Sequence, residues 1–246
     1  MKITINGENI FYEQLGKGKK EVVLLHGWGQ NLEMMMPLAK KLEDTYHITI
    51  LDLPGFGASF TPEKALTIYE YETIIEDFFN KLNITNPILI GHSFGGRIAI
   101  IYSSKNKVNK LILMGAPCVR EKKKTKLLYK FFKFICITKR SKEFFKLKYG
   151  SVDYNNTKGA MRSLFVNTIN EDLSSCAKKI SCPTLLVWGS KDTAAPINDA
   201  YKLKELINNC EMIEIKDATH YTYLEKLDYV SEQIINFLEK GDEYDN

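Results

Sequence analysis

Five short apolar runs, each ending at or near Gly or Pro, recur along the chain and set the main limit on its fold. They cover residues 21–27, 47–55, 87–93, 110–117 and 183–190. Strands buried on both faces of a parallel sheet give such unbroken runs, whereas half-exposed strands alternate apolar and polar residues. A sixth parallel strand is predicted within 210–220, where β-branched residues precede a loop.

Segments long enough for helices separate these runs. They cover residues 31–44, 69–82, 94–105, 198–209 and 227–240. Strands that alternate with helices predict an α/β fold, in which helices cover both faces of a mostly parallel sheet. The opening residues 2–16 predict an antiparallel hairpin at one edge of that sheet, and Asn6-Gly7 suits its two-residue turn.

Residues 118–180 interrupt the alternation and differ in charge from the rest of the chain. They contain 16 Lys or Arg and 5 Asp or Glu residues, whereas the remainder contains 18 and 25. No strand of the earlier kind occurs here, and helices are predicted at 124–135, 141–150 and 158–169. The pattern predicts an α/β core at 1–117 and 181–246 with a helical insertion at 118–180.

Length and composition indicate an ordinary globular protein. The chain has 246 residues, of which 44% are apolar and 26% charged, and no run of about 18 apolar residues predicts a membrane span. The N-terminus lacks the apolar core of a secretory signal. Five scattered cysteines without a CxxC pair favour free thiols in the cytoplasm over disulfides or a metal site. Nothing in the sequence indicates a metal or an organic cofactor.

The third apolar run ends in the motif G-x-S-x-G, which places Ser93 between a strand and a helix. This is the context in which the motif forms a nucleophile elbow, and Gly91 and Gly95 leave space for the sharp turn. The alternative is a strand-to-helix turn that contains a serine by chance. The preceding strand and the polar residues that follow later in the chain favour the catalytic interpretation.

A serine hydroxyl needs a base, and histidine is the side chain whose pKa suits this task. Four histidines occur in the chain. His47 opens a strand, His26 precedes the serine in the chain, and the elbow should point His92 away from Ser93. His220, in the loop after the last strand, fits the chain order Ser, Asp, His. The alternative for His220 is a histidine in a surface loop.

The acid that orients the base should follow a strand between Ser93 and His220. Asp192 lies just past the end of the strand predicted at 183–190, where it could accept a hydrogen bond from the imidazole and fix its tautomer. Asp217 is nearer in sequence to His220 but suits local bonding in that loop. Asp52 also ends a strand and is interpreted as structural.

Two main-chain N–H groups could hold the oxyanion formed on the substrate. One belongs to Phe94, directly after the serine, and the other to Trp28, in the loop that follows the first core strand. An alternative for the Trp28 side chain is an aromatic cover over the core. The two interpretations are compatible, because only the main-chain N–H is needed.

The segments HGWGQN, LDLPGFGAS, GHSFGG, WGSKD and ATHYTYLEK, in this order, resemble the α/β-hydrolase fold family. The resemblance spans nearly the whole chain. It implies Ser93 as nucleophile, Asp192 as acid, His220 as base, and Trp28 and Phe94 as oxyanion donors, with a helical cap at about 118–180. A serine at position 93 argues against the dehalogenases and epoxide hydrolases of the family, whose elbow carries Asp. HGWG and the chain length are similar to the carboxylesterase branch that includes the pimeloyl-carrier-protein methyl ester esterases.

The sequence therefore predicts a serine hydrolase that cleaves a carboxylic ester through an acyl-enzyme. A thioesterase acting on acyl-CoA or acyl-carrier protein and a carbon–carbon bond hydrolase remain alternatives, as does a ligand-binding receptor or scaffold on the same fold. Residues 120–150 carry 12 Lys or Arg and 2 acidic residues, which indicates either a solvated helix face or attraction to an anionic carrier protein, acyl-CoA, phosphorylated ester or membrane surface. A nucleic-acid partner is not expected, because the aromatic residues Phe131, Phe132, Phe134, Phe144 and Phe145 are predicted to face the core and the acyl pocket.

Overall fold

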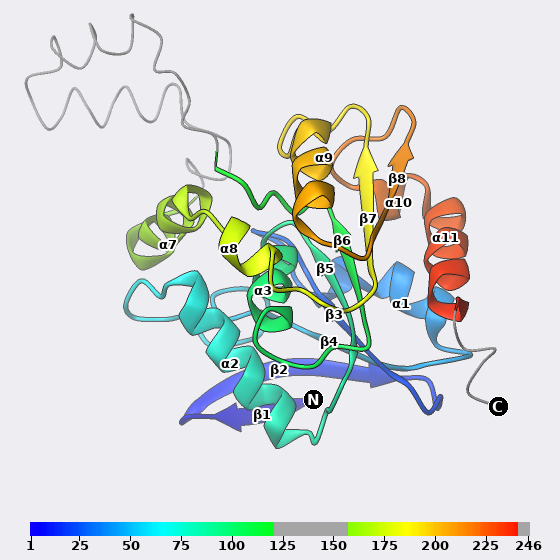
Figure 1. Ribbon diagram of the computed structural model, residues 1–246. Coiled ribbons are helices and arrows are strands. Elements are labelled where there is room, and N and C mark those ends of the chain that lie inside the picture. The colour runs from blue at the N-terminus through cyan, green and yellow to red at the C-terminus, as the bar shows by residue number, and fades with distance from the viewer. Residues whose placement is uncertain (121–156, 241–246) are drawn as a thin grey trace, which may run out of the picture.

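The computed structural model describes residues 1–120 and 157–240, and in them an eight-stranded sheet forms the centre of the molecule (Figure 1). The strand order is β1-β2-β4-β3-β5-β6-β7-β8, and all neighbours from β4 to β8 pair in parallel. The strands are β1 (Lys2–Ile5), β2 (Glu8–Leu15), β3 (Glu21–Leu25), β4 (His47–Leu51), β5 (Ile88–His92), β6 (Lys110–Met114), β7 (Thr184–Gly189) and β8 (Cys210–Ile215). The expected mostly parallel sheet is confirmed, including its sixth parallel strand.

Helices connect these strands. A 3₁₀ turn at Leu32–Met34 precedes the first of them. The helices are α1 (Met36–Leu42), α2 (Ile68–Lys81), α3 (Phe94–Ser103), α7 (Gly159–Asn170), α8 (Ser174–Ala177), α9 (Ile197–Leu206), α10 (Thr222–Glu225) and α11 (Leu227–Glu239). None of the helices in 1–120 and 157–240 is both long enough and apolar enough to cross a membrane.

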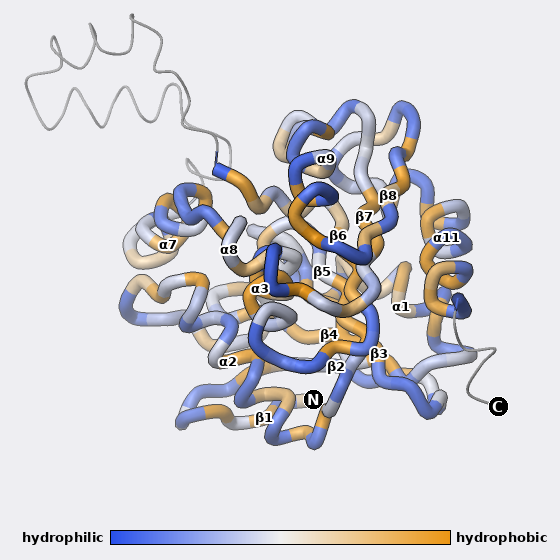
Figure 2. Tube along the Cα trace, in the orientation of Figure 1, coloured by the Kyte–Doolittle hydropathy of each residue, from blue (hydrophilic) through white to orange (hydrophobic). Residues whose placement is uncertain are grey.

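The helices cover both faces of the sheet, and alternate residues of each central strand face opposite layers. In β3, Val23 and Leu25 join a buried cluster with α2, α3 and α9, whereas Val22 and Leu24 join a second cluster with α1 and α11. Figure 2 shows the resulting apolar centre beneath helices of mixed character. Burial on both sides explains why the strands appear in the sequence as unbroken apolar runs.

The N-terminal hairpin is also confirmed. Strands β1 and β2 pair antiparallel, and Asn6 (φ 51°) and Gly7 (φ 87°) form the turn between them. Positive φ at both central residues is the requirement of the tight turn that an Asn-Gly pair satisfies. Strand β2 then pairs antiparallel with β4, which places the hairpin at one edge of the sheet.

The charged insertion enters after β6 and returns before β7, two strands that pair directly with each other. The helix expected over 158–169 is confirmed as α7, whereas the helices predicted at 124–135 and 141–150 lie outside the described residues, as do the five phenylalanines between 131 and 145. Arg97 of α3 is buried and donates to the carbonyl oxygens of Pro117, Thr168 (2.9 Å) and Glu171 (2.8 Å). One buried side chain of α3 therefore ties the chain directly after β6 to the C-terminal end of α7.

Candidate active site

Ser93 occupies the turn between β5 and α3 in a strained backbone conformation. Its φ is 50° and its ψ is −108°, and it is the N-cap residue of α3. A positive φ is costly for a residue with a Cβ atom and persists only where the surrounding structure enforces it. Its N–H donates to the carbonyl of Met114 at 2.9 Å, which ties the turn to the end of β6. The structure thus forms the elbow that G-x-S-x-G predicts.

Two glycines allow this turn because other backbone segments occupy the space of their side chains. A Cβ atom on Gly91 would lie 2.5 Å from the Cα atom of Gly96. A Cβ atom on Gly95 would collide with the carbonyl groups of Leu25 and His26. The start of α3 can therefore approach both β5, which precedes it, and the end of β3 only if positions 91 and 95 lack side chains.

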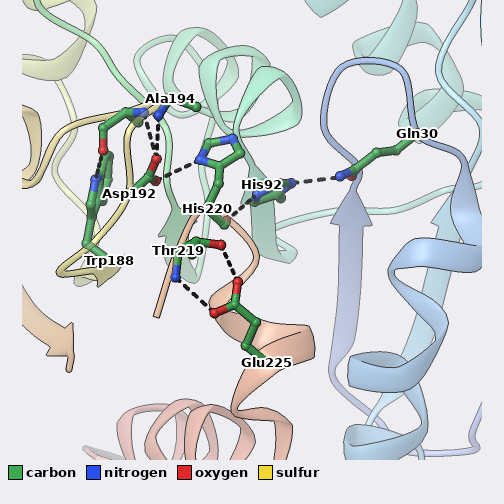
Figure 3. A network of polar contacts seen from close by, with 9 residues as sticks. Gln30, His92, Trp188, Asp192, Ala194, Thr219, His220 and Glu225 are labelled. Atoms are coloured by element: carbon green, nitrogen blue, oxygen red, sulfur yellow. Dashed lines mark hydrogen bonds and ion pairs between the residues drawn. The ribbon is translucent and has the colours of Figure 1, made fainter. Parts of the chain in front are cut away.

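His220 and Asp192 lie in direct contact although they belong to different loops. The Nδ1 atom of His220 is 2.7 Å from Oδ2 of Asp192 (Figure 3), and the aspartate side chain is 1% exposed while the histidine side chain is 15% exposed. The other carboxylate oxygen of Asp192 accepts the N–H groups of Ala194 (2.9 Å) and Ala195 (2.8 Å). The carboxylate is thus held from one side by its own loop and presents its second oxygen to the imidazole.

The imidazole of His220 lies over the end of β6, next to the elbow. A Cβ atom on Gly115 would be 3.0 Å from both Cε1 and Nδ1 of that ring, and Gly115 directly follows Met114, the residue bonded to the Ser93 N–H. Within residues 1–120 and 157–240, no hydrogen bond joins the Ser93 hydroxyl to the imidazole. Such bonds are often long before substrate binds. The imidazole and the Ser93 turn are therefore adjacent in the structure without a hydrogen bond between them.

The competing carboxylates lie elsewhere. Asp217 pairs with Lys191 at 2.8 Å, and its side chain is 59% exposed. Asp52 is buried at the end of β4, and its side-chain oxygens accept the N–H groups of Leu32 and Ala58, both at 2.7 Å. The first residue thus makes a surface ion pair, and the second organises the loops after β3 and β4.

The other three histidines make contacts away from the Ser93 hydroxyl. His26 is buried, accepts the Leu53 N–H at Nε2 (2.9 Å), and its Nδ1 lies 2.7 Å from the Gly27 carbonyl oxygen. Burial lowers the pKa of His26 to about 4. His47 pairs with Glu21 at the opposite end of the sheet, where β3 and β4 begin. His92 is fully buried, and its Nε2 lies 3.0 Å from the main-chain oxygen of His220.

Two main-chain N–H groups stand near the serine without a protein partner. In the part of the chain that the structure describes, the N–H groups of Trp28 and Phe94 donate to no other protein group. The next N–H, that of Gly95, donates to the His26 carbonyl at 3.1 Å, which joins the start of α3 to the loop after β3. The ring centroids of Trp28 and Phe94 are 5.2 Å apart, so the side chains of these two residues are in contact.

Aromatic side chains and an open groove border the site. The Trp28 ring also contacts Phe56 (5.1 Å between centroids) and Phe165 of α7 (5.0 Å). A groove of about 660 Å³ runs past Trp28. It is lined by Trp28, Gly29, Gln30, Asn31, Met34, Gly55, Phe56, Gly57, Thr157 and Tyr221. Its lining combines the aromatic rings of Trp28, Phe56 and Tyr221 with polar side chains and main chain, and it opens beside the loop that carries the Trp28 N–H.

Metal-binding side chains do not gather anywhere in the described ranges, which contain no group of three or more His, Cys, Asp or Glu arranged to hold an ion. The four cysteines found there, Cys118, Cys176, Cys182 and Cys210, are free. Burial raises the pKa of the Cys118 thiol to about 12, so this thiol is not an activated nucleophile.

Several residues that support the site were not identified from the sequence. Glu225 accepts the Thr219 N–H at 2.9 Å and also pairs with the Thr219 hydroxyl, just before His220 (Figure 3). Only six positions separate these two residues, so this contact is local to the loop. Arg97 and His92 gave no local signal, because their partners lie far away in the chain.

Comparison with known proteins gives one family and a consistent set of relatives. The family model described as alpha/beta hydrolase fold matches residues 20–135 and 125–227. A pimeloyl-[acyl-carrier protein] methyl ester esterase of Wigglesworthia glossinidia brevipalpis is 28% identical over 87% of this chain and 92% of that protein. A 2-hydroxy-6-oxononadienedioate/2-hydroxy-6-oxononatrienedioate hydrolase of Klebsiella pneumoniae is 24% identical over 94% and 91%. The solved esterase from Exiguobacterium antarcticum superposes with a TM-score of 0.76 at 23% identity, over 96% of this chain and 97% of that one.

Proposed function

Because the chain belongs to the alpha/beta hydrolase fold family, we propose that it is a serine hydrolase that cleaves carboxylic esters. In this proposal Ser93 is the nucleophile, His220 the general base and Asp192 the acid that orients the base. The observation that carries the proposal is the 2.7 Å contact between His220 and Asp192, beside a serine held at positive φ in an elbow. Strain at such a position is typical of a functional site.

The first half of the reaction forms an acyl-enzyme. The Ser93 oxygen attacks the ester carbonyl carbon while its proton passes to Nε2 of His220. Asp192 accepts the Nδ1–H of the ring, which leaves Nε2 free to receive that proton and stabilises the imidazolium. When the tetrahedral intermediate collapses, the bond from carbon to the alcohol oxygen breaks, and the imidazolium gives its proton to the departing alcohol.

The second half releases the acid. Water attacks the acyl carbon and loses a proton to His220. The bond from that carbon to the Ser93 oxygen then breaks, and the imidazolium returns the proton to restore the Ser93 hydroxyl. In both halves the substrate carbonyl oxygen becomes negatively charged. The N–H groups of Trp28 and Phe94, which have no partner among the described residues, are suited to stabilise that charge. Loss of one such donor typically slows catalysis by about 10²–10³-fold.

We further propose that residues 118–180 form a helical cap over a core made of 1–117 and 181–246. Two side chains of α7 support this arrangement. Phe165 packs on the Trp28 ring, and Met161 fills the space beside Gly55, where a Cβ atom would lie 2.5 Å from its methyl carbon. A cap in this position would cover the aromatic side of the site and help to select the acyl group.

The basic stretch 120–150 suggests that the natural substrate carries negative charge. We propose an acyl group on an anionic carrier protein or on CoA, in line with the carrier protein in the name of the Wigglesworthia relative. If so, the KM for a carrier-bound ester should rise with ionic strength, because salt screens the attraction. The KM for a small neutral ester should change little, and equal salt dependence of both would contradict the proposal.

A carbon–carbon bond hydrolase is the second candidate, because the Klebsiella relative is named as a hydrolase of a 2-hydroxy-6-oxo dienedioate. A thioesterase would use the same three side chains, and a binding protein could retain them without turnover. A panel of p-nitrophenyl esters, acyl-CoA thioesters and vinylogous diketones of graded length separates these classes by kcat/KM.

The decisive experiment compares Ser93→Ala with the wild type. Hydrolysis of p-nitrophenyl butyrate should be lost in Ser93→Ala while the urea unfolding curve is unchanged. The matched control is Ser104→Ala at the other end of α3, which should keep full activity. A fluorophosphonate should label Ser93 in the wild type. Retained turnover in pure Ser93→Ala would remove Ser93 from the mechanism.

A further inference from the structure

His92 has no role in the reaction proposed above, yet it touches the loops that carry two other parts of the site. It is the last residue of β5, directly before Ser93, and is fully buried. Its Nε2 lies 3.0 Å from the main-chain oxygen of His220, and its Nδ1 lies 3.3 Å from the side-chain oxygen of Gln30 (Figure 3). A buried histidine with both ring nitrogens next to oxygen atoms calls for an explanation.

The partners define which ring nitrogen carries the proton. Burial, followed by the proximity of His220, lowers the pKa of His92 to about 3, so the ring is neutral near pH 7 and holds one proton. A carbonyl oxygen only accepts hydrogen bonds, and the contact with the His220 carbonyl is the shorter of the two. We therefore assign the proton to Nε2, which donates to His220.

The opposite edge of the ring packs against the loop after β3 that carries the Trp28 N–H (the oxyanion loop). A Cβ atom on Gly27 would lie 2.7 Å from His92 Nδ1, so the ring fills the space that this glycine leaves. The Gly27 N–H in turn donates to the Gln30 side-chain oxygen at 2.9 Å. Gly27 directly precedes Trp28, so the ring is held between the oxyanion loop and the His220 loop.

The contact acts on the backbone of His220, not on its side chain. Asp192 already orients the imidazole. The loop that carries His220 must also lie at a fixed distance from β5, the strand directly before Ser93. The rings of His92 and His220 lie 4.7 Å apart between centroids, so a displacement of the loop would move the base directly. Displacements of about 1 Å can cost about 10²-fold in rate.

We propose that His92 is a positioning residue, which holds the His220 loop against β5 by donating its Nε2–H to the His220 carbonyl. This inference rests on the proposed esterase function. It predicts that the hydrogen bond, and not merely the bulk of the ring, supports catalysis. It also predicts that His92 affects kcat more than KM, because the substrate does not touch it.

Two substitutions distinguish the bond from the bulk. The amide nitrogen of His92→Gln can reach the position of Nε2 and donate to the carbonyl, whereas that of His92→Asn reaches only the position of Nδ1. We expect kcat for p-nitrophenyl butyrate to stay within about 3-fold of wild type in His92→Gln. We expect it to fall about 10–100-fold in His92→Asn, with KM changed less than about 3-fold. His47→Asn, at the far end of the sheet, is the matched control and should leave kcat unchanged.

A spectroscopic readout keeps the test independent of folding losses. The Nδ1 proton of His220, held by Asp192, should give a downfield proton resonance that stays sharp in His92→Gln and broadens in His92→Asn. If His92→Asn fails to fold, His92→Gln decides the question: activity and resonance retained support the bond, and their loss in the folded variant overturns it. Equal activity of both variants also overturns the inference. Failure of the proposed function is distinct, because the wild type would then show no turnover that depends on Ser93.

Discussion

The Nδ1 atom of His220 lies 2.7 Å from Oδ2 of Asp192, although 28 positions separate the two residues in the chain. In Asp192→Asn, the side-chain oxygen can still accept the Ala194 and Ala195 N–H groups, so the fold should persist. The amide would instead donate to Nδ1 and favour the wrong tautomer of the base. We expect kcat to fall by about 10⁴-fold, as measured with a p-nitrophenyl ester.

The control for this change is Asp217→Asn, which alters an exposed carboxylate in the His220 loop that pairs with the surface residue Lys191. Its kcat should remain within about 2-fold of wild type, because a surface ion pair contributes little. If the two variants lost activity equally, Asp192 would not be the acid that orients His220.

Relief of strain at the elbow should stabilise the protein. Glycine adopts the φ of 50° found at Ser93 without the steric cost that a Cβ atom imposes. We expect Ser93→Gly to raise the free energy of unfolding by about 1 kcal/mol, measured by urea denaturation, while it abolishes hydrolysis. Ser104→Gly should give no such gain, because Ser104 has ordinary helical dihedrals (φ −77°). A less stable Ser93→Gly would show that the turn stores no strain.

The elbow should tolerate no side chain at position 91. In Gly91→Ala the new Cβ atom would lie 2.5 Å from the backbone of Gly96, and backbone cannot rotate away as a side chain can. We expect a loss of about 3 kcal/mol in the free energy of unfolding. Gly29→Ala meets open space and bears only the cost of its positive φ, about 1 kcal/mol. Equal losses in the two variants would mean that β5 and α3 can move apart.

Removal of the buried guanidinium of Arg97 should loosen the contact between the chain after β6 and the C-terminal end of α7. Arg97→Met leaves the carbonyls of Pro117, Thr168 and Glu171 without their charged donor in a buried setting. A loss of about 3 kcal/mol in the free energy of unfolding is expected, with a smaller loss in Arg97→Lys. Arg120→Met removes an exposed bond to Asn170 and should cost about 0.5 kcal/mol or less. A similar cost for both arginines would argue that the carbonyls find other donors.

Two buried histidines should make the fold sensitive to acid. Burial lowers the pKa of His26 to about 4 and that of His92 to about 3, whereas the unfolded chain takes up these protons near pH 6.5. The unfolded state therefore binds more protons below pH 6.5, and stability falls as pH falls, by about 1.4 kcal/mol per pH unit for each histidine. Urea unfolding at pH 7.0, 6.0 and 5.0 measures this slope. His26→Gln should reduce it by about one proton, and an unchanged slope would contradict the assignment of His26 as neutral.

The sheet and the three side chains of the proposed triad could be located from local sequence, because each depends on a local pattern. Strands buried on both faces appear as apolar runs, and Ser93 and Asp192 each follow the end of such a run, whereas His220 follows the partly exposed edge strand β8. At the carboxyl ends of parallel strands, residues far apart in the chain come together. The three residues of the proposed triad could therefore be predicted to lie near one another without knowledge of any contact between them.

The supporting contacts could not be predicted in the same way. His92 and the His220 carbonyl are 128 positions apart, and Arg97 and Glu171 are 74 apart. Such pairs depend on how loops pack after the sheet has formed, and no periodicity in the sequence encodes them. The short helices α8 and α10, of four residues each, were also missed, since tertiary packing rather than propensity stabilises them.

Strands β6 and β7 are neighbours in the sheet, yet the charged segment 118–180 separates them in the sequence. The two strands pair in register, with Leu111 opposite Thr184. Loop-closure entropy grows only slowly with length, so such a segment can lengthen, shorten or change its composition at little thermodynamic cost to the strands. Under the cap arrangement proposed above, evolution can thus vary the part that would meet the substrate without disturbing the part that would perform the chemistry. A chimera that exchanges this segment with that of a relative should inherit the donor's preference for acyl chains while retaining the host's thermal stability.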